Sequence, residues 1–348
     1  MPNIKLNDIK LIPNLESVYR EKISDAIYFS DQYSDYISNS RLKLINPDQM
    51  GSPSKYQKGF TGETTQSLSI GSAVHELLLQ PNDFMLVYNI DKPPAKLGQV
   101  IEQVYKNRMS NQTIYDSIVN ACKQIHYYEN SLTNSRISFI IREGLKYYFQ
   151  LKQYIHDEGA ILLSKRDRII VEKCIDNLQR SSQVQSLLNP IDLFGDPIQS
   201  FNEDAFFINL DGSYLDQTCI LKIKMKADNW SIDVDNKIIT LNDLKTTGHL
   251  LSQFMQSDGS FFNFHYSRQF AMYLWILLRY CEKEYGYNKE EWKVKCNVIV
   301  SETTADNRCC VFSINSEYLE KGRKEFCKLL KMVAYCEMYG YSDDIIFE

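Results

Sequence analysis

The sequence predicts an α+β protein in which a long helical region precedes a β-sheet. Apolar residues recur at helical spacing through much of residues 31–195, whereas the text after Pro197 alternates apolar and polar residues with a period of two. The 348 residues are 44% apolar and 24% charged, which are ordinary values for a globular chain. We therefore expect a folded protein and exclude disorder, collagen-like repeats and coiled coils.

Composition also restricts the partners, the location and the metal sites that we expect of the protein. The net charge is −5, so any contact with nucleic acid must come from a local basic surface. Long apolar runs and a secretory signal pattern are absent, which predicts a soluble protein of the cytoplasm with no membrane contact. The nine cysteines include no CxxC pair and are expected to be reduced thiols, not ligands of a zinc or iron–sulfur site.

The N-terminal half is expected to be largely helical. Weak periodicity in residues 1–30 predicts a partly ordered N-terminal arm or a peripheral helix, and we expect a single domain over residues 31–348. Ser38, Asn39 and Ser40 are candidate caps of a short helix before a loop at Pro53. A buried helix that carries His75 should follow and end before Pro81. Helices are then expected through residues 97–190.

The C-terminal part, residues 196–348, should form the sheet and its covering helices. The expected strands and helices, in order, are strands 205–210, 219–228, 231–234 and 237–245, a helix over 267–284, strands 292–301 and 308–314, and a helix over 317–338. Asp211-Gly212 and Asp235-Asn236 are typical of hairpin turns. The first strands should therefore form a meander.

Charged residues gather at two expected strand ends. Strand alternation places Lys222, Lys224, Lys226 and Asp228 on one face, and it also places Asp243 and Lys245 on a common face. Two carboxylates at neighbouring strand ends repel unless a cation such as Mg²⁺ or Mn²⁺ lies between them. With Lys245 beside a bound water or phosphate, the implied chemistry is phosphodiester hydrolysis. The alternative is that these charges are simply solvated.

Other polar residues have two interpretations each. Gln269 and Tyr273 lie four residues apart on one helical face, and they either support the strand-end acids or are hydrogen-bonded core residues. His75 is either a metal ligand or a hydrogen-bonded histidine. Arg268 and the three lysines either contact phosphate or are solvated.

Six segments, in this order, resemble the PD-(D/E)XK nuclease superfamily, and within it the RecB-like group that includes RecE, or exodeoxyribonuclease VIII, and phage-encoded relatives. The segments are YISNSRLKLINPDQMGSPSKY, SIGSAVHELLLQPNDF, KIKMKADN, NDLKTT, YSRQFAMYLW and YLEKGRKEFCKLLKMVAYCEMYG. The resemblance spans roughly residue 30 to the C-terminus, and residues 100–155 are expected to be an insertion. It departs from the superfamily name at Ala227, which stands in place of proline.

The resemblance implies a central mixed sheet flanked by helices and a role for each matched residue. His75, Asp228, Asp243 and the main-chain carbonyl of Leu244 would bind the metal, and Lys245 would be the catalytic lysine. Glu203 would be a further catalytic acid, with Asp204 as an alternative. Gln269 and Tyr273 match the Q-x₃-Y motif, which supports the site and DNA, and Arg268, Lys224 and Lys226 are candidate DNA contacts.

The function implied is a Mg²⁺-dependent or Mn²⁺-dependent exonuclease that acts on linear double-stranded DNA ends in phage-type recombination or replication. RecE-like enzymes form rings, so a homo-oligomeric ring, a single-strand annealing partner and a prophage origin in a bacterial cytoplasm are expected with it. Two alternatives remain open: an endonuclease or repair nuclease of the same fold, and a non-catalytic DNA-binding partner in recombination.

Overall fold

The structure, a computed structural model, describes residues 3–59, 66–80, 87–93, 95–109, 112–154, 161–304 and 306–348. The chain divides into two compact units. The first consists of residues 1–65, 78–80 and 173–348, and the second of residues 66–77 and 81–172, which contain the whole of the expected insertion at 100–155. Each unit is described by itself.

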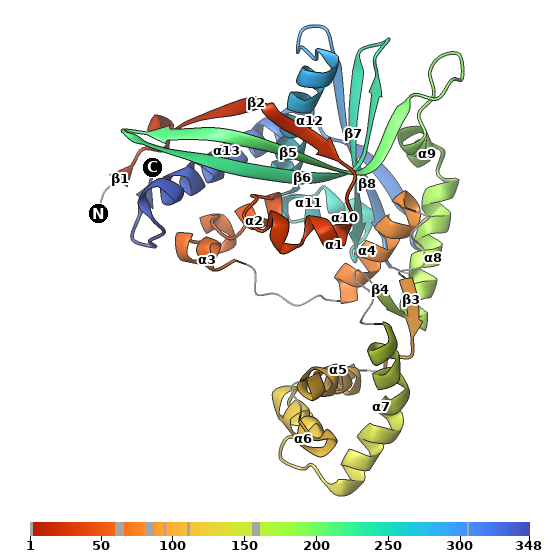
Figure 1. Cartoon of the computed structure of the whole chain (residues 1–348). Helices are drawn as coiled ribbons and strands as arrows, with labels where there is room; N and C mark the ends of the chain where they lie inside the picture. The colour runs from red at the N-terminus through yellow and green to blue at the C-terminus, as the bar shows by residue number, and fades with distance from the viewer. Residues whose placement is uncertain are drawn as a thin grey trace. The chain divides into compact units, whose positions relative to one another are not determined.

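The first unit is built on a six-stranded mixed sheet flanked by helices, which confirms the expected α+β class (Figure 1). The strand order is β2 (Lys10–Glu21), β5 (Gln199–Tyr214), β6 (Gln217–Asp233), β7 (Ile238–Thr247), β8 (Lys293–Glu302) and β9 (Cys309–Ser313). Neighbours are antiparallel except β7 and β8, which run parallel. Parallel neighbours need a crossover connection, and α12 (Tyr266–Tyr285) lies in it.

Two long helices bury the main core against the sheet. Helices α12 and α13 (Ser316–Tyr339) pack on each other and against β5 and β6. The shared core includes Phe206, Met225, Trp230, Phe270 and Leu330, each at most 1% exposed. Helix α12 follows β7 after two short helices, and its first turns reach back to that strand, where Gln269 contacts Asp243.

The first thirty residues are not a peripheral arm. Strand β2 pairs antiparallel with β5 and forms the edge of the sheet. Its residues alternate between exposed and half-buried, and it contains Pro13, which an edge strand tolerates because one side of its backbone needs no partner. The sequence of this strand contains charged residues and a proline and has no clear apolar period, so periodicity did not predict it.

The β5–β6 hairpin is longer than expected. Asp211 and Gly212 lie inside β5, where Gly212 pairs with Cys219, and the turn comes at Leu215 and Asp216. A Cβ at Gly212 would lie 2.7 Å from the Cys219 sulfur, so this glycine permits close approach and does not form a turn. The expected strands 219–228 and 231–234 are one strand, β6.

Strand β6 pairs with β7 only over Asn229–Asp233. Along the rest of that edge, Ile37 forms a parallel bridge to Ile223. The chain on either side of Ile37 forms α1 (Asp25–Tyr28), η2 (Asp31–Tyr33) and α2 (Asn39–Leu42). The strands β6 and β7 therefore separate just where Asp228 and Asp243 lie.

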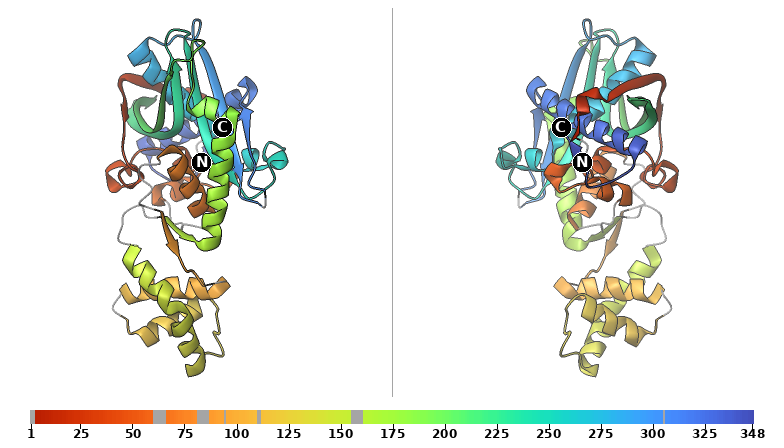
Figure 2. Two further views of the ribbon diagram at one scale, coloured as in Figure 1. Left: turned by 90° about the vertical axis from the view of Figure 1, so that its right-hand side faces the viewer. Right: turned by 90° about the vertical axis from the view of Figure 1, so that its left-hand side faces the viewer.

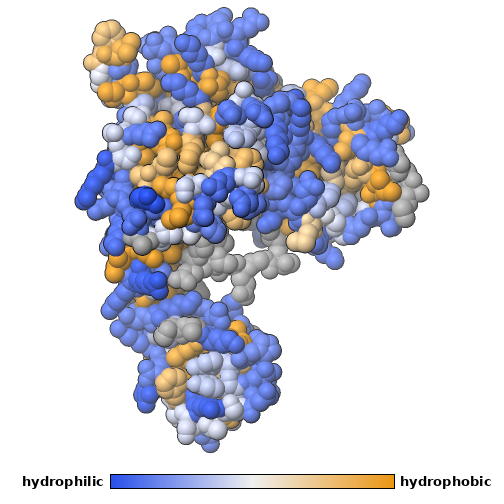
Figure 3. All heavy atoms as spheres, turned by 180° about the vertical axis from the view of Figure 1, so that it is seen from behind, coloured by the Kyte–Doolittle hydropathy of each residue, from blue (hydrophilic) through white to orange (hydrophobic). Residues whose placement is uncertain are grey.

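The remaining elements of the first unit are short. They are η1 (Leu6–Asp8), η3 (Pro47–Gln49), α3 (Pro53–Lys58), α9 (Ser182–Leu188), α10 (Leu251–Phe254), α11 (Ser260–Asn263) and the parallel pair of β1 (Asn3–Ile4) with β10 (Ile346–Phe347). This pair brings the two ends of the chain together, as both views of Figure 2 show. On the face shown in Figure 3, hydrophobic residues are scattered among hydrophilic ones, as is usual for an exposed surface.

The second unit has a small helical core of its own. Helices α5 (Ala95–Met109), α6 (Ile114–Gln124) and α7 (Asn134–Tyr154) pack together around Val100, Ile118, Ile140 and other buried residues. Strand β4 (Ile161–Ser164), which pairs parallel with β3 (Val87–Ile90), interrupts the helical run expected over 97–190. Helices α4 (Gln66–Leu79) and α8 (Lys165–Arg180) are continuous across the division between the units. No described helix combines the length and apolarity needed to cross a membrane.

Candidate active site

Three carboxylates lie in one row across neighbouring strands of the first unit. The pairs on either side in the β5–β6 register place Glu203 opposite Asp228. Extending the β6–β7 register by one residue places Asp228 opposite Asp243. A carboxylate oxygen of Glu203 and one of Asp228 lie within 4.8 Å of each other. We call Glu203, Asp228 and Asp243 the acid row; like charges placed opposite one another cost up to about 1 kcal/mol per pair.

Glu203 is held in an unusual backbone conformation. Its φ of 55° is in the left-handed region, which costs a non-glycine residue about 1–2 kcal/mol. The residue is 7% exposed, and its Oε2 lies 3.0 Å from the Lys226 ammonium. Lys226 also pairs with Asp25 of α1. The strain and the buried charge occur together at one position, which is the pattern expected of a functional site.

Asp243 is the most buried acid of the row, at 1% exposure. Its Oδ1 accepts a hydrogen bond of 2.9 Å from the Gln269 side-chain amide, and its Oδ2 pairs with the Lys245 ammonium. Burial lowers the pKa of Lys245, but the attraction of Asp243 and then of Asp228 outweighs it, so the net pKa is raised above its ordinary value. Lys245 is therefore a cation in this site, and its ammonium lies 5.2 Å from the centre of the Tyr266 ring.

Asp228 joins β6 to β7 where the regular pairing of these strands ends. Its Oδ2 accepts a hydrogen bond of 2.6 Å from the backbone N–H of Leu244. The Asp228 side chain thus takes the place of a backbone hydrogen bond between the two strands. It fixes the backbone between Asp243 and Lys245. The Leu244 carbonyl as a metal ligand stays a prediction.

The two residues of the Q-x₃-Y motif lie on the face of α12 toward the acid row. Gln269 contacts Asp243, as described, and Tyr273 follows one turn later. Burial raises the pKa of the Tyr273 hydroxyl well above its ordinary value, and the nearby charges of Asp243, Asp228 and Glu203 raise it further. Tyr273 is therefore neutral at physiological pH, and its O–H remains a possible donor to a carboxylate.

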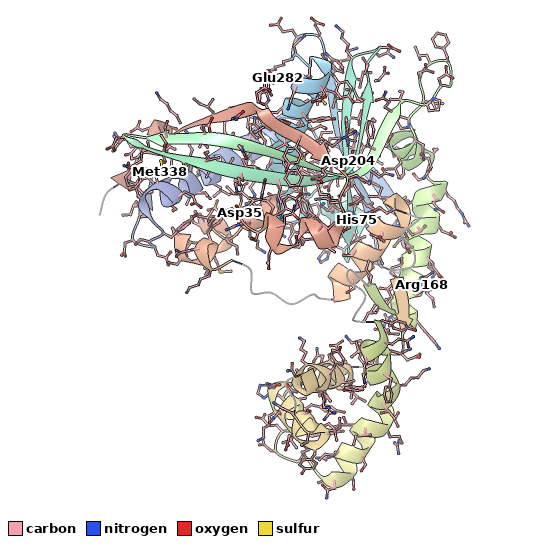
Figure 4. The ribbon with its side chains drawn as sticks, viewed as in Figure 1. Asp35, His75, Arg168, Asp204, Glu282 and Met338 are labelled. Atoms are coloured by element: carbon pink, nitrogen blue, oxygen red, sulfur yellow. The ribbon has the colours of Figure 1, made fainter. Side chains whose placement is uncertain are left out.

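The basic strip of β6 is covered by the chain between residues 25 and 36. Lys224 is 6% exposed and donates a 2.7 Å hydrogen bond to the Tyr28 carbonyl, and burial lowers its pKa to about 8. The exposed Lys222 pairs with Asp35 at 2.9 Å (Asp35 is labelled in Figure 4). The expected phosphate contacts of Lys224 and Lys226 are therefore corrected: both ammonium groups are buried against protein partners.

Arg268 also differs from its expected role. It is 1% exposed, and its guanidinium donates to Asn39, Gln49 and Glu325, each at 2.9 Å. Successive residues on a helix point about 100° apart, so Arg268 faces away from the side on which Gln269 meets Asp243. The DNA contact expected of Arg268 is corrected to a structural one between α12, α13 and the N-terminal segment.

The structure separates Glu203 from its neighbour Asp204. Asp204, labelled in Figure 4, accepts a 2.9 Å hydrogen bond from the Trp230 indole N–H and lies 3.5 Å from Arg20. Asp204 therefore contacts Trp230 and Arg20 and not the acid row. Glu203 is the acid opposite Asp228.

His75 lies on α4 in the second unit and is half-buried. The last residues of the same helix, Leu78 and Leu79, belong to the first unit. There the Leu79 carbonyl accepts a 3.2 Å hydrogen bond from the side chain of Asn202, which directly precedes Glu203. The role of His75 as a ligand stays a prediction.

The residues present suit a hard divalent cation. Carboxylate oxygens that face one another across a strand pair are the ligands that Mg²⁺ and Mn²⁺ prefer, and an imidazole is compatible with Mn²⁺. The strained backbone of Glu203 and the opposed charges of Glu203 and Asp228 are costs that a bound cation would offset.

Sequence reasoning missed two features of the site. One is Tyr266, whose ring lies beside Lys245. The other is that an asparagine adjoins each acid of the row in the chain, as Asn202, Asn229 and Asn242. The sequence shows that an asparagine stands next to each of the three acids. A comparison of the chain neighbours of each candidate ligand would have found this repeat.

No protein-family model matches the chain, and no curated protein sequence matches it. Two solved structures are similar to it in part. A candidate exonuclease from Eubacterium rectale shares 12% identity over 91% of this chain and 86% of its own, with a TM-score of 0.47. Scheffersomyces stipitis Rai1, solved with 3′-NADP⁺ and calcium, shares 10% identity over 97% of this chain and 86% of its own, with a TM-score of 0.21.

Proposed function

We propose that this protein is a metal-dependent deoxyribonuclease whose active site is the acid row with Lys245. The observation that carries the proposal is the row itself: Glu203, Asp228 and Asp243 come from three adjacent strands, and a buried cationic lysine pairs with the last of them. Buried groups of this kind, with a strained backbone among them, are typical of catalytic sites and are costly in a merely structural role.

Glu203, Asp228 and Asp243 would hold the cation, with His75 and the Leu244 carbonyl as further ligands. When bound, Mg²⁺ or Mn²⁺ would supply a Lewis acid for the phosphoryl oxygen and lower the pKa of a bound water. Lys245, kept cationic by Asp243, would orient the attacking water or stabilise negative charge that develops on the phosphate. Gln269 holds Asp243 in place through its side-chain amide.

We further propose that the substrate is linear double-stranded DNA, degraded from its ends as in RecE-like exonucleases of phage recombination or replication. The support for this finer proposal is the resemblance of the six ordered segments. A homo-oligomeric ring, a single-strand annealing partner and a bacterial cytoplasmic setting belong to the same proposal. A ring would hold DNA without a strongly basic monomer, which suits the net charge of −5.

The test is hydrolysis of end-labelled linear duplex DNA by the purified protein with Mg²⁺ or Mn²⁺. We expect Asp243→Ala and Lys245→Ala to lower the rate by at least about 100-fold, since each removes a group that acts on the reacting phosphate. Asp235→Ala and Lys237→Ala, at the turn before the same strand, are the matched controls and should keep the parent rate. Intact linear DNA with every metal tested, or equal rates in the site and control variants, would refute the proposal.

Covalently closed circular DNA, incubated in parallel, separates the modes of cutting. An exonuclease cannot begin on it, so we expect it to remain intact. Cleavage of the circle would replace the exonuclease proposal with an endonuclease or repair nuclease that uses the same acid row. Cation binding by the parent without cleavage of either DNA would indicate the non-catalytic alternative.

A further inference from the structure

A row of asparagine side chains crosses the sheet directly beside the acid row. Residues directly opposite one another on β5, β6, β7, β8 and β9 are Asn202, Asn229, Asn242, Asn297 and Ser313. We call these the asparagine row. Each acid is the chain neighbour of one member, so the two rows occupy adjacent positions along β5, β6 and β7, and alternation directs them to opposite faces of β6 and β7.

The side chains of the row form one continuous chain of hydrogen bonds. The Ser313 hydroxyl donates to Asn297 at 3.1 Å, Asn297 donates to Asn242 at 2.9 Å, and Asn242 donates to Asn229 at 2.7 Å. Asn229 then donates to Asn202 at 2.8 Å, and Asn202 donates to the Leu79 carbonyl at 3.2 Å. Five successive bonds therefore run in one direction, from β9 to the end of α4.

Two carbonyl groups fix that direction. The carbonyls of Leu79 and Leu187 can only accept, and they receive the side-chain NH₂ groups of Asn202 and Asn242. Reversing either amide would bring two carbonyl oxygens together and leave a buried donor without its partner. Because Asn242 is fully buried and Asn229 is 1% exposed, such a loss would cost about 1–3 kcal/mol.

The asparagine row crosses β6 and β7 at the point where the backbone hydrogen bonds between these two strands end. Regular pairing between β6 and β7 ends at Asn229 and Asn242, and the next position is occupied by the opposed acids Asp228 and Asp243. Repulsion in the acid row would push the strands apart at that point. The bond between Asn229 and Asn242, which is shielded from water, opposes this separation together with the bond from the Leu244 N–H to Asp228.

We propose that the part of the asparagine row that adjoins the acids, Asn202, Asn229 and Asn242, is the positioning element of the metal site, an inference that rests on the proposed function. It sets the lateral spacing of the three strands that carry the acids. Through the Leu79 carbonyl it also holds the last turn of α4, the helix on which His75 lies four residues upstream. The asparagines are positioning residues: they act on the cation only through the acids beside them, as outer-shell partners of metal ligands do.

The chain supplies a matched pair of variants. Asn229 and Asn297 are both buried members of the row, but Asn229 adjoins Asp228 whereas Asn297 adjoins Val298. If the row serves only the stability of the sheet, Asn229→Ala and Asn297→Ala should behave alike. If it positions the acids, Asn229→Ala should affect the metal site and Asn297→Ala should not.

The first measurement is calorimetric titration of the full-length protein with Mn²⁺. We expect Asn229→Ala to weaken binding by about 10–100-fold and Asn297→Ala by less than about 3-fold, with similar losses of thermal stability in the two variants. Unchanged affinity in Asn229→Ala, or equal loss in both variants, would overturn the inference. If Asn229→Ala fails to fold, Asn202→Ala, which is half-buried at the end of the row beside Glu203, takes its place.

The second measurement needs no metal. The Leu244 N–H donates to Asp228, so its hydrogen exchange reports the spacing of β6 and β7. In EDTA we expect faster exchange across residues 243–247 in Asn229→Ala than in Asn297→Ala, and equal exchange would overturn the positioning role. If the parent binds no Mn²⁺, the proposed function fails, while this exchange experiment still decides whether the asparagine row positions the acids.

Discussion

Two buried polar clusters begin at consecutive residues of α12 and differ in how their charges are balanced. The Arg268 cluster contains one carboxylate, Glu325, which pairs with the guanidinium at 2.9 Å and with His265 at 2.7 Å and accepts from Asn46 at 3.0 Å. Donors and acceptors there are matched within the protein. The acid row, reached from Gln269, places three carboxylates side by side and adds a strained backbone at Glu203.

The difference shows what burial of charge does and does not indicate. Each cluster contains a charged residue that is only 1% exposed, Arg268 in one and Asp243 in the other, so burial alone would mark both as sites. Only the acid row combines opposed like charges with backbone strain, which is a cost that a bound cation would offset. The single carboxylate of the Arg268 cluster is matched by the guanidinium, whereas the acid row places three carboxylates against two lysines, Lys226 and Lys245, and this excess of negative charge suits a bound cation.

The largest effect that this comparison predicts is on stability. Arg268→Ala should lower the free energy of unfolding by about 3–5 kcal/mol, because it leaves the Glu325 carboxylate without its guanidinium partner. Urea denaturation measures the change. Arg323→Ala, which removes an exposed pair with Glu320 on α13, is the control and should cost less than about 1 kcal/mol. A loss below about 1 kcal/mol in Arg268→Ala would mean that the cluster is not a stabilising one.

Neighbouring acids should respond to different degrees in the metal-free protein. Asp204→Asn should cost about 1–3 kcal/mol, since the buried carboxylate accepts from Trp230 and faces Arg20. Glu203→Asn should cost less, because asparagine tolerates the left-handed backbone, the repulsion from Asp228 is removed, and Lys226 keeps Asp25 as a partner when it loses Glu203.

Denaturation in EDTA measures both changes, and Mn²⁺ titration should show binding lost in Glu203→Asn. Equal destabilisation by the two substitutions would show that Glu203 is a structural acid like Asp204. Retained Mn²⁺ binding in Glu203→Asn would remove that residue from the proposed ligand set while leaving Asp228 and Asp243 in it.

Parts of this arrangement were readable from the sequence because they depend on local periodicity. Strand alternation put Asp228 at the end of a basic strip, and the four-residue spacing of Gln269 and Tyr273 put both on one helical face. The α+β class followed from the change of period after Pro197. Each of these inferences needs only residues that are neighbours in the chain.

What could not be read depends on contacts between distant segments. The opposition of Glu203 and Asp228 is a property of the β5–β6 register, which a one-residue slip would abolish. The burial of Lys224 depends on chain nearly 200 residues away, at Tyr28. The helical period does not show whether Arg268 or Gln269 faces the acids. Only the packing of α12 in the structure shows that it is Gln269. The edge strand β2 was missed because an exposed edge needs no apolar face.

The smallest predicted effect concerns Lys224, a buried charge that belongs to neither cluster and meets a carbonyl instead of a carboxylate. Its pKa is lowered to about 8, chiefly by burial, whereas an unfolded lysine keeps its ordinary value of 10.5. Between these values the unfolded chain binds more protons than the folded one, so this residue makes stability rise with pH. Lys245 has the opposite sign, because its raised pKa favours the folded state until the pH passes above the ordinary value.

Denaturation of the parent and of Lys224→Met at pH 7 and at pH 10 isolates the Lys224 contribution. We expect the parent to gain about 1 kcal/mol relative to the variant over this interval, less than the full pKa shift would give, because the hydrogen bond to the Tyr28 carbonyl offsets part of the cost of burial. Lys222→Met, which removes an exposed lysine from the same strand face, is the control and should show no such gain. Parallel curves for parent and Lys224→Met would mean that the hydrogen bond to the Tyr28 carbonyl compensates the buried ammonium. The buried charge of Lys224 would then be compensated within the protein, like that of Arg268, and the acid row would stand out further as the region where carboxylates outnumber the lysines that pair with them.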